Sequence, residues 1–293
     1  MTEPQTAGPE AVRVERPVVE FLRMYVRNWA AVAGFLVFSA IVFAALFAPL
    51  ILAVDPFEMV WMPFTPPGQD GYIFGTDNLG RDMLTAILYG ARSTLVVGAS
   101  AAALTIVIGI TIGSLAGYYR GWVDEVLMRI TEFFQVLPPL LLAMVLVALF
   151  SPTLTTVAIA IGVVTWTGVA RLARAEFMRI RELEFVKAAR SIGSRDRRII
   201  WRVILPNALP PLIVNAALTV GIAILFEAAL SFLGLSDPNV MSWGKLIGDN
   251  RDYLLDAPWT VTIPGVAIFF TVLAVSLIGD GLNDAFNPRL RER

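Results

Sequence analysis

The stretch STLVVGASAAALTIVIGITIGSLAGY, residues 93–118, contains no charged side chain. An α-helix rises 1.5 Å per residue, so about 20 apolar residues cross the roughly 30 Å hydrocarbon core of a bilayer. Gly109, Gly113 and Gly117 recur every four residues in this stretch and line one helical face. In lipid, small residues at that spacing let two helix backbones approach closely. The stretch therefore predicts a membrane-spanning helix with one face packed against another helix.

Five further apolar runs are long enough to span a bilayer, and they lie near 29–53, 126–150, 153–170, 208–234 and 257–280. The whole chain is 57% hydrophobic and 16% charged, whereas soluble domains average about 45–50% apolar and about 25% charged. We therefore predict an all-α integral membrane protein with six transmembrane helices. Pro138-Pro139 and Pro210-Pro211 are expected to kink or begin helices, because proline cannot donate a helical hydrogen bond.

The basic residues predict the orientation. If the N-terminus is cytoplasmic, all but four of the 23 Lys and Arg residues fall on the cytoplasmic side, as the positive-inside rule requires. The four exceptions are Arg81, Arg92, Lys245 and Arg251. An even number of spans then places both termini in the cytoplasm.

These spans divide the chain into three predicted parts. Residues 1–20 are expected to form a disordered cytoplasmic tail because they are polar and contain proline. Residues 21–286 form the six-span domain, with an extracytoplasmic loop at 54–92 and a cytoplasmic loop at 171–206. Residues 287–293 are expected to be a cytoplasmic tail.

The composition excludes several kinds of catalytic and metal-binding site. The chain has no Cys and no His, which excludes disulfides, thiolate or imidazole metal sites and nucleophile–His pairs. No G-x-x-x-x-G-K-[ST] loop occurs, so ATP would have to be bound by another chain. We expect no catalytic residue, no cofactor or metal held by this chain and no nucleic-acid partner. Asp280 and Asp284 could hold a cation, but a cap or an interhelical contact is favoured, and Glu227 could be functional or structural.

A basic segment interrupts this apolar sequence. EFVKAARSIGSRDRRIIWRVILP, residues 184–206, is cytoplasmic in the predicted orientation. Phe185, Ala188 and Ile192 fall on one helical face, and Gly193 is expected to end that helix. Ser194 is a plausible N-cap for a second helix that ends at Leu205-Pro206. The basic residues of the segment are Lys187, Arg190, Arg195, Arg197, Arg198 and Arg202.

Two interpretations of this segment remain open on pattern alone. A small, apolar helical face suits docking into a groove of a partner protein. A basic amphipathic helix pair also suits the surface of an anionic bilayer.

The same segment resembles the EAA loop of ABC importer permeases, which reads E-A-A, three residues, Gly, nine residues and I-x-L-P. Ala188, Ala189, Gly193 and Leu205-Pro206 match this motif at the required spacing. Lys187 stands where Glu is usual, which puts in doubt a salt bridge to the ATPase. The resemblance implies that Lys187, Ala188, Ala189, Gly193, Leu205 and Pro206 dock onto an ATPase.

Four other blocks resemble the dipeptide/oligopeptide permease family, and specifically its C-type subunit. They are FGTDNLGRDMLTAILYGARSTLVVG (74–98), GYYRGWVDEVLMRITEFFQVLPPLLLAM (117–144), SFLGLSDPNVMSWGKLIGDNRDYLLDAPW (231–259) and GDGLNDAFNPRL (279–290). In the last block Asn283 and Asn287 replace an Arg and an Asp that are frequent in this branch. That departure weakens any ionic role for the C-terminal segment.

The resemblance implies a type I ABC importer permease fold in the cytoplasmic membrane of a prokaryote. In this family a B-type permease completes the translocation path, two partner ATPases bind ATP and Mg, and an extracytoplasmic binding protein delivers peptide. Related systems carry nickel chelates, glutathione or other small solutes.

The residues of the extracytoplasmic family motif are Gly75, Thr76, Asp77, Gly80, Arg81 and Asp82. Thr76 or Asp77 is expected to cap a short helix leading into the second span. Arg81 and Asp82 are expected to fix the loop against neighbouring chains. Direct contact of the motif with the binding protein or the peptide is the alternative.

The sequence also allows a guess at pathway-lining residues and a comparison with two alternative functions. Asn215 and Thr219 are candidates for lining the pathway, because few polar residues lie within the spans. A secondary transporter would need broken helices within repeats, and no repeat is evident. A membrane enzyme without His or Cys would need a Ser–Lys or Asp–Asp site, and the spans contain no Lys.

Overall fold

The computed structural model describes residues 17–52 and 54–286, in which every regular element is a helix. The helices are α1 (Pro17–Arg27), α2 (Trp29–Ile51), α3 (Met83–Tyr119), α4 (Gly121–Val136), α5 (Pro139–Phe150), α6 (Leu154–Arg181), α7 (Glu184–Ser191), α8 (Asp196–Arg198), a π-helical turn (Ile199–Ile204), α9 (Leu205–Phe232), α10 (Trp243–Asn250), a 3₁₀ turn (Arg251–Tyr253) and α11 (Trp259–Phe286). Between α2 and α3, only isolated β-bridges occur. The prediction of an all-α protein is confirmed.

Five of these helices are long and apolar enough to cross a bilayer, and the pair α4–α5 makes a sixth span if it counts as one. The axes of α4 and α5 differ by 86°. The break lies at Leu137-Pro138, and α5 begins at Pro139, so the predicted effect of this proline pair is confirmed. Pro210 and Pro211 instead lie inside α9, which continues through them.

Several helices extend beyond their apolar runs. α3 begins at Met83, so the outer loop spans 54–82 and not 54–92. Its 37 residues correspond to about 55 Å, far more than the bilayer core requires. α6 likewise continues to Arg181, which shortens the cytoplasmic loop predicted to begin at residue 171. Hydropathy marks the part of a helix inside lipid, whereas backbone hydrogen bonding continues beyond it.

The ends of the chain are described only in part. α1 begins at Pro17, so residues 17–20 are helical and the tail predicted through residue 20 is too long. Residues 1–16, residue 53 and residues 287–293 lie outside the described residues, and with them the remaining tail predictions and Asn287.

The glycine stripe of α3 packs against α6, as its spacing predicts. A Cβ atom on Gly109 would stand 2.5 Å from Cβ of Val169, and one on Gly117 would stand 2.6 Å from the carbonyl oxygen of Arg174. Between them, Gly113 lies directly against the Ala170 carbonyl. Any side chain at these positions would force the two helices apart, so this contact sets how closely α3 and α6 pack.

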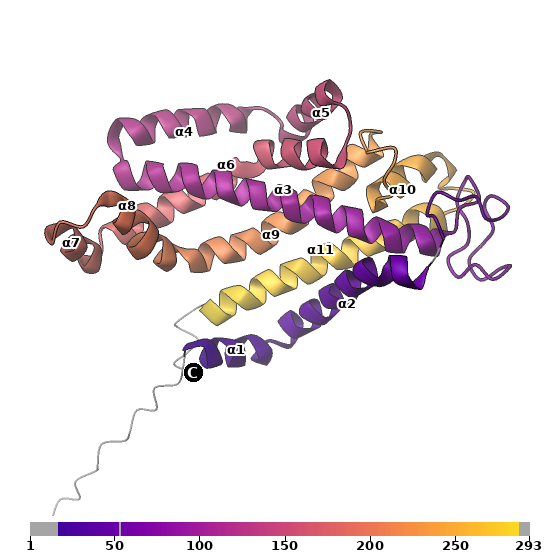
Figure 1. Ribbon diagram of the computed structural model, residues 1–293, viewed down its shortest axis with the longest axis horizontal. Coiled ribbons are helices and arrows are strands. Elements are labelled where there is room, and N and C mark those ends of the chain that lie inside the picture. The colour runs from indigo at the N-terminus through magenta and orange to yellow at the C-terminus, as the bar shows by residue number, and fades with distance from the viewer. Residues whose placement is uncertain (1–16, 53, 287–293) are drawn as a thin grey trace, which may run out of the picture.

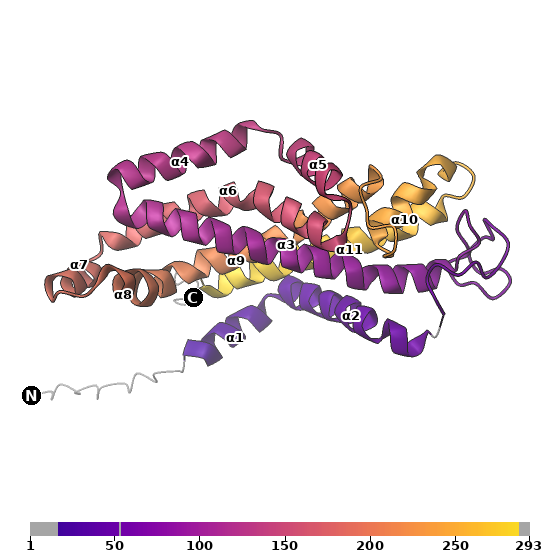
Figure 2. The same cartoon turned by 45° about the horizontal axis from the view of Figure 1, so that its top comes forward.

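The long helices run side by side, and α3 contacts α6, α9 and α2 (Figure 1). α4 and α5 lie on the outside of α6, whereas α2 and α11 pack together on the opposite side (Figure 2). In both views α7 and α8 lie at one end of the bundle, and α10 and the 54–82 loop lie at the other. The first described residues of α1 and the last of α11 lie toward the α7 end.

Candidate functional site

The segment between α6 and α9 forms a short exposed helix that is tied to the bundle. On α7, Val186 is fully buried against the core cluster that contains Phe177 and Ile199. Phe185 and Ile192 are instead 46% and 83% exposed, and Ala188 is exposed beside them. The one fully buried side chain of the helix is therefore Val186, and the predicted apolar face is left uncovered.

Gly193 ends α7 as its sequence predicts. Its φ is +78°, a left-handed conformation that glycine adopts without the usual steric cost. The Gly193 N–H donates to the carbonyl of Arg190, and the Ser194 N–H donates to that of Ala189. These two bonds form a Schellman motif. The N-cap of α8 is Arg195, which makes no side-chain capping bond, so the prediction that Ser194 caps this helix was wrong.

Tyr118, at the end of α3, joins three parts of this segment and was missed in the sequence. Its hydroxyl donates to Oδ1 of Asp196 at 2.5 Å, and its carbonyl accepts from Nη1 of Arg181 at 2.6 Å. The guanidinium of Arg190, on α7, lies 5.8 Å from the ring centroid, within cation–π range. A tyrosine after an apolar run gives no sequence signal for such contacts, because its partners are 63 or more residues away.

The second helix of the segment does not end at Leu205-Pro206, contrary to prediction. α8 passes through the π-helical turn directly into α9. In the turn, the Leu205 N–H reaches back to the Ile200 carbonyl. Pro206 donates no backbone bond, and the side-chain amide of Asn207 donates to the Val203 carbonyl at 2.7 Å. The proline is tolerated because it stands in the first turn of α9.

The charges of the segment face solvent. Lys187 Nζ lies 3.1 Å from Oε1 of Glu184, one turn earlier on α7, and both side chains are exposed. An acidic residue thus stands beside the position where the motif usually carries Glu. Beyond α7, a hollow of about 490 Å³ is lined by Trp201 and four arginines. The arginines are Arg195, Arg197, Arg198 and Arg202.

Of the remaining motif residues, Ala189 is half-buried, Gly193 is exposed, Leu205 is half-buried and Pro206 is exposed. The structure therefore places the six predicted docking residues in two groups. Lys187 to Gly193 form the exposed end of α7, whereas Leu205 and Pro206 begin the span. Their role in docking stays a prediction.

The predicted extracytoplasmic motif, residues 75–82, is held by contacts within its own loop. Nε of Arg81 lies 2.5 Å from Oδ2 of Asp77, and both side chains are buried. The Thr76 hydroxyl donates to the Met62 carbonyl at 2.7 Å. The expectation that Thr76 or Asp77 caps a helix was wrong: Asp82 is the N-cap of α3 and accepts from Leu84 N–H and Thr85 N–H. Oδ1 of Asp77 instead accepts hydrogen bonds from the Leu79 and Arg81 N–H groups, in the turn that contains Gly80.

This motif is held against α10 and α11 of the same chain. The Asn78 N–H donates to Oδ1 of Asn250 at 3.1 Å, and the Trp259 indole donates to the Thr76 carbonyl at 3.2 Å. Gly75 and Gly80 have positive φ, and a Cβ on either would collide with a backbone carbonyl. All of these contacts lie within the chain. Contact of Arg81 and Asp82 with neighbouring chains, or of the motif with the binding protein or the peptide, stays a prediction.

Several other polar residues of the spans form hydrogen bonds within the chain. The Thr219 hydroxyl donates to the Asn215 carbonyl at 2.8 Å and is buried, whereas Asn215 is half-buried. Asp284 accepts from the side-chain amide of Asn28 at 2.9 Å, which joins α11 to the start of α2. Glu227 is buried and accepts from the Ser231 hydroxyl at 2.8 Å. Among the described residues no group of three possible metal ligands occurs.

Comparison with known proteins identifies two family regions in the chain. Residues 109–292 match the family described as "Binding-protein-dependent transport system inner membrane component". Residues 17–69 match the "N-terminal TM domain of oligopeptide transport permease C". Together these matches include α2, the last turns of α3, and the chain from α4 through α11, with the segment between α6 and α9.

Curated relatives extend over nearly the whole chain. A dipeptide transport system permease protein of Alkalihalophilus pseudofirmus is 39% identical over 99% of this chain and 96% of its own length. A di/tripeptide transport system permease protein of Pseudomonas aeruginosa is 40% identical over 94% and 93%. A glutathione transport system permease protein of Pectobacterium atrosepticum is 35% identical over 95% and 93%.

The fold also has a solved relative. A chain of the MetNI methionine ABC transporter in an inward-facing conformation superposes with a TM-score of 0.56, over 68% of this chain and 94% of that one. Its 19% sequence identity supports the shared type I permease fold and nothing finer. The chain belongs to the binding-protein-dependent transport inner-membrane family, as a C-type permease of the dipeptide/oligopeptide ABC importers.

Proposed function

We propose that this chain is the C-type transmembrane subunit of an ATP-driven peptide importer in the cytoplasmic membrane of a prokaryote. It forms half of the translocation path with a B-type permease, and an extracytoplasmic binding protein delivers peptide to its outer end. Two partner ATPases bind ATP and Mg and perform the hydrolysis. This chain carries no phosphate-binding loop and binds no cofactor of its own.

The observation that carries the proposal is the exposed apolar face of α7. Phe185 and Ile192 project from a short helix at the end of the bundle where the termini of the chain are predicted to be cytoplasmic. Adjacent exposed apolar side chains on a surface that faces water mark interaction sites. In this family, the matching helix seats in a cleft of the ATPase.

The contacts of Tyr118 explain how a movement of α7 would reach the spans. α7 and α8 are tied through Arg190 and Asp196 to the end of α3, and α8 continues into α9 without a break. α3 in turn packs on α6 through the glycine stripe. A displacement imposed on α7 would therefore move these helices together, as a rigid-body change in alternating access.

Co-purification tests this assignment directly. The tagged chain is expressed with its neighbouring genes, extracted in mild detergent and assayed for ATP hydrolysis. We expect an ATP-hydrolysing subunit to accompany it, and an Ile192→Asp variant to lose that subunit while still inserting into membranes. If the unaltered chain purifies without ATPase activity, the importer assignment fails.

Glutathione or another small solute is a second candidate for the cargo, because one relative at 35% identity is a glutathione permease. Competition separates the candidates. Vesicles containing the complex should take up labelled dipeptide, and unlabelled dipeptide should compete better than glutathione. The reverse order would assign the chain to the second candidate.

Asn215 and Thr219 stay proposed as pathway-lining residues. Thr219→Val removes a hydroxyl that already bonds to the backbone, so we expect a small effect from it. Asn215→Ala removes the half-exposed amide and should alter the relative uptake of different peptides. Unchanged rates and substrate range in both variants would remove these residues from the pathway.

A further inference from the structure

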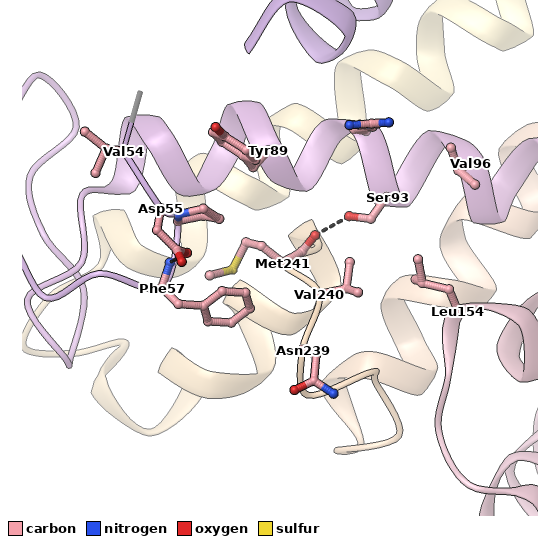
Figure 3. A pocket seen from close by; sticks show the side chains of 12 residues that line it. Val54, Asp55, Phe57, Tyr89, Ser93, Val96, Leu154, Asn239, Val240 and Met241 are labelled. Carbon is pink, nitrogen blue, oxygen red and sulfur yellow. Dashed lines mark hydrogen bonds between the residues drawn. The ribbon is translucent and has the colours of Figure 1, made fainter. Parts of the chain in front are cut away.

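A cavity of about 780 Å³ opens at the outer end of the bundle, opposite α7. Its walls come from four separate segments: residues 54–57, α3, the start of α6 at Leu154, and residues 239–241 before α10 (Figure 3). The Ser93 hydroxyl donates to the Met241 carbonyl, and the Tyr89 hydroxyl donates to the Leu52 carbonyl at 3.1 Å. The walls are therefore held together, and the volume falls in the range of small-molecule sites.

Arg92 lines this cavity and has no ion pair or hydrogen bond within the part of the chain that the structure describes. It differs in this from the other three basic residues predicted on the outer side. Arg81 pairs with Asp77, Lys245 with Asp249, and Arg251 with the Phe232 carbonyl. A guanidinium at the start of an apolar span needs water or an anion, and a carboxylate satisfies it with two parallel bonds.

The cavity also contains a carboxylate, that of Asp55. Its Oδ1 accepts from the Phe57 N–H at 2.8 Å, which fixes the side chain and leaves Oδ2 without a partner among the described residues. The remaining lining includes the apolar side chains of Phe57, Val96 and Val240 beside polar groups. One cationic group, one anionic group and an apolar wall match a small zwitterion with variable side chains.

We propose that this cavity binds a short peptide by its free termini, with the carboxylate on Arg92 and the ammonium group on Asp55. The apolar wall accepts side chains without selecting one. This inference rests on the proposed function, since it assigns to the same importer a receiving site for peptide at the outer end. A carboxylate from a partner subunit is the alternative occupant of Arg92.

The absence of Cys in the chain provides a direct test. Asn239→Cys places a single thiol on the cavity wall, and Leu255→Cys places one at a position that is 96% exposed and outside the cavity. Each variant is reconstituted with its ATPases, second permease and binding protein and then labelled with a membrane-impermeant maleimide. Electrophoresis separates this chain from any Cys-containing partner.

Dialanine is added together with the binding protein, at ten times the dissociation constant of dialanine for the cavity. It should slow labelling of Asn239→Cys about tenfold by occupying the cavity. Labelling of Leu255→Cys should not change. Adding Arg92→Gln or Asp55→Asn should remove the protection, and Arg92→Lys should retain part of it. Asparagine keeps the Oδ1 acceptor of Asp55, so this variant removes charge without removing the cap on Phe57.

Equal labelling with and without dialanine would overturn the inference. So would an Asn239→Cys thiol that reacts in the isolated chain but not in the assembled complex, because a partner subunit would then fill the cavity. Dialanine uptake by the same vesicles without a cysteine substitution is measured in parallel. If uptake is present and protection absent, only this inference fails; if uptake is absent, the proposed function fails first.

Discussion

The two ends of the bundle are built in opposite ways. At the outer end, the 54–82 loop buries the Asp77–Arg81 ion pair and bonds to α10 and α11. At the other end, α7 is held to the bundle mainly by Val186 and by contacts to Tyr118, and its apolar face and most of its charges are exposed. The charged and polar groups of the outer loop find partners within the chain, whereas α7 leaves an apolar face exposed.

This difference predicts different consequences of mutation. Removing a buried partner at the outer end should cost folding free energy, because a buried charge loses its closest partner. Changing an exposed residue of α7 should leave the fold intact and affect the connection to another protein. Stability and coupling can therefore be measured separately, one at each end.

The largest expected effect is from Asp77→Asn. This change removes the closer partner of the buried Arg81 guanidinium and leaves the Asp249 carboxylate, which lies 3.5 Å from Nη2. Breaking one partner of a buried ion pair costs about 3–5 kcal/mol. Thermal unfolding in detergent, followed by helical circular dichroism, should show a lower midpoint.

The matched control for that variant is Arg129→Ala on α4. Arg129 pairs with Glu132, but both side chains are largely exposed, so their pair contributes about 0.5 kcal/mol or less. A midpoint that falls equally in the two variants would contradict the contrast between the ends.

The next effect comes from two glycines that end helices at opposite ends of the bundle. Gly193 follows α7 with φ +78°, and Gly234 follows α9 with φ +83°; both close Schellman motifs, and a Cβ on either meets nothing within 4 Å. Replacement by Val should strain each backbone by about 1–2 kcal/mol. Only Gly193→Val is expected to abolish transport and uncouple ATP hydrolysis.

Reconstituted vesicles give both readouts, uptake and ATPase rate, for the two variants. Similar stability with different coupling would assign the loss to the position of Gly193 and not to strain. Equal loss of coupling in Gly234→Val would mean that the two ends do not divide stability and coupling in this way.

The sequence predicts local features of these ends well and long-range contacts poorly. Gly193, Pro139 and the glycine stripe of α3 act through backbone geometry within a few residues, so their positions alone predict the helix end, the break and the close packing. The partner of Asp77 is only four residues away, yet its burial depends on α10 and α11. A capping role was therefore expected where the structure has an ion pair.

The charge-lined cavity at Arg92 lies further from what the sequence can predict. Positive-inside counting places Arg92 on the outer side together with Arg81, Lys245 and Arg251. Asp77 and Asp249 stand four residues from Arg81 and Lys245, whereas the Phe232 carbonyl that accepts from Arg251 is 19 residues away. The packing of four distant segments places Arg92 on a cavity wall, where it has no partner among the described residues.

A smaller effect is expected from Tyr118→Phe. The change deletes the hydroxyl that donates to Asp196 and keeps the ring over which Arg190 lies. A hydrogen bond to a charged group contributes about 1.5–3 kcal/mol where it is buried, and less here because Asp196 is exposed. We expect ATP hydrolysis to continue with reduced transport per ATP, because α8 is less firmly attached to α3.

Asp196→Asn provides the matched comparison for Tyr118→Phe. It keeps an oxygen acceptor for the hydroxyl and should retain most of the coupling. If Tyr118→Phe transports as much peptide per ATP as the unaltered protein, the attachment of α7 and α8 does not depend on this bond.

The smallest effect tests how α7 meets its partner. Lys187 pairs with Glu184 in solvent, and an exposed pair of this spacing contributes about 0.3–0.5 kcal/mol. Lys187→Gln should therefore change uptake less than about twofold, as should Glu184→Gln.

Lys187→Glu restores the residue usual in the motif but reverses the charge presented to the ATPase. If the partner surface is acidic opposite Lys187, this variant should reduce ATPase co-purification more than Lys187→Gln does, and the loss should shrink as salt is raised because exposed charges are screened. Equal binding by both variants would mean that the exposed end of α7 is recognised by its apolar face alone.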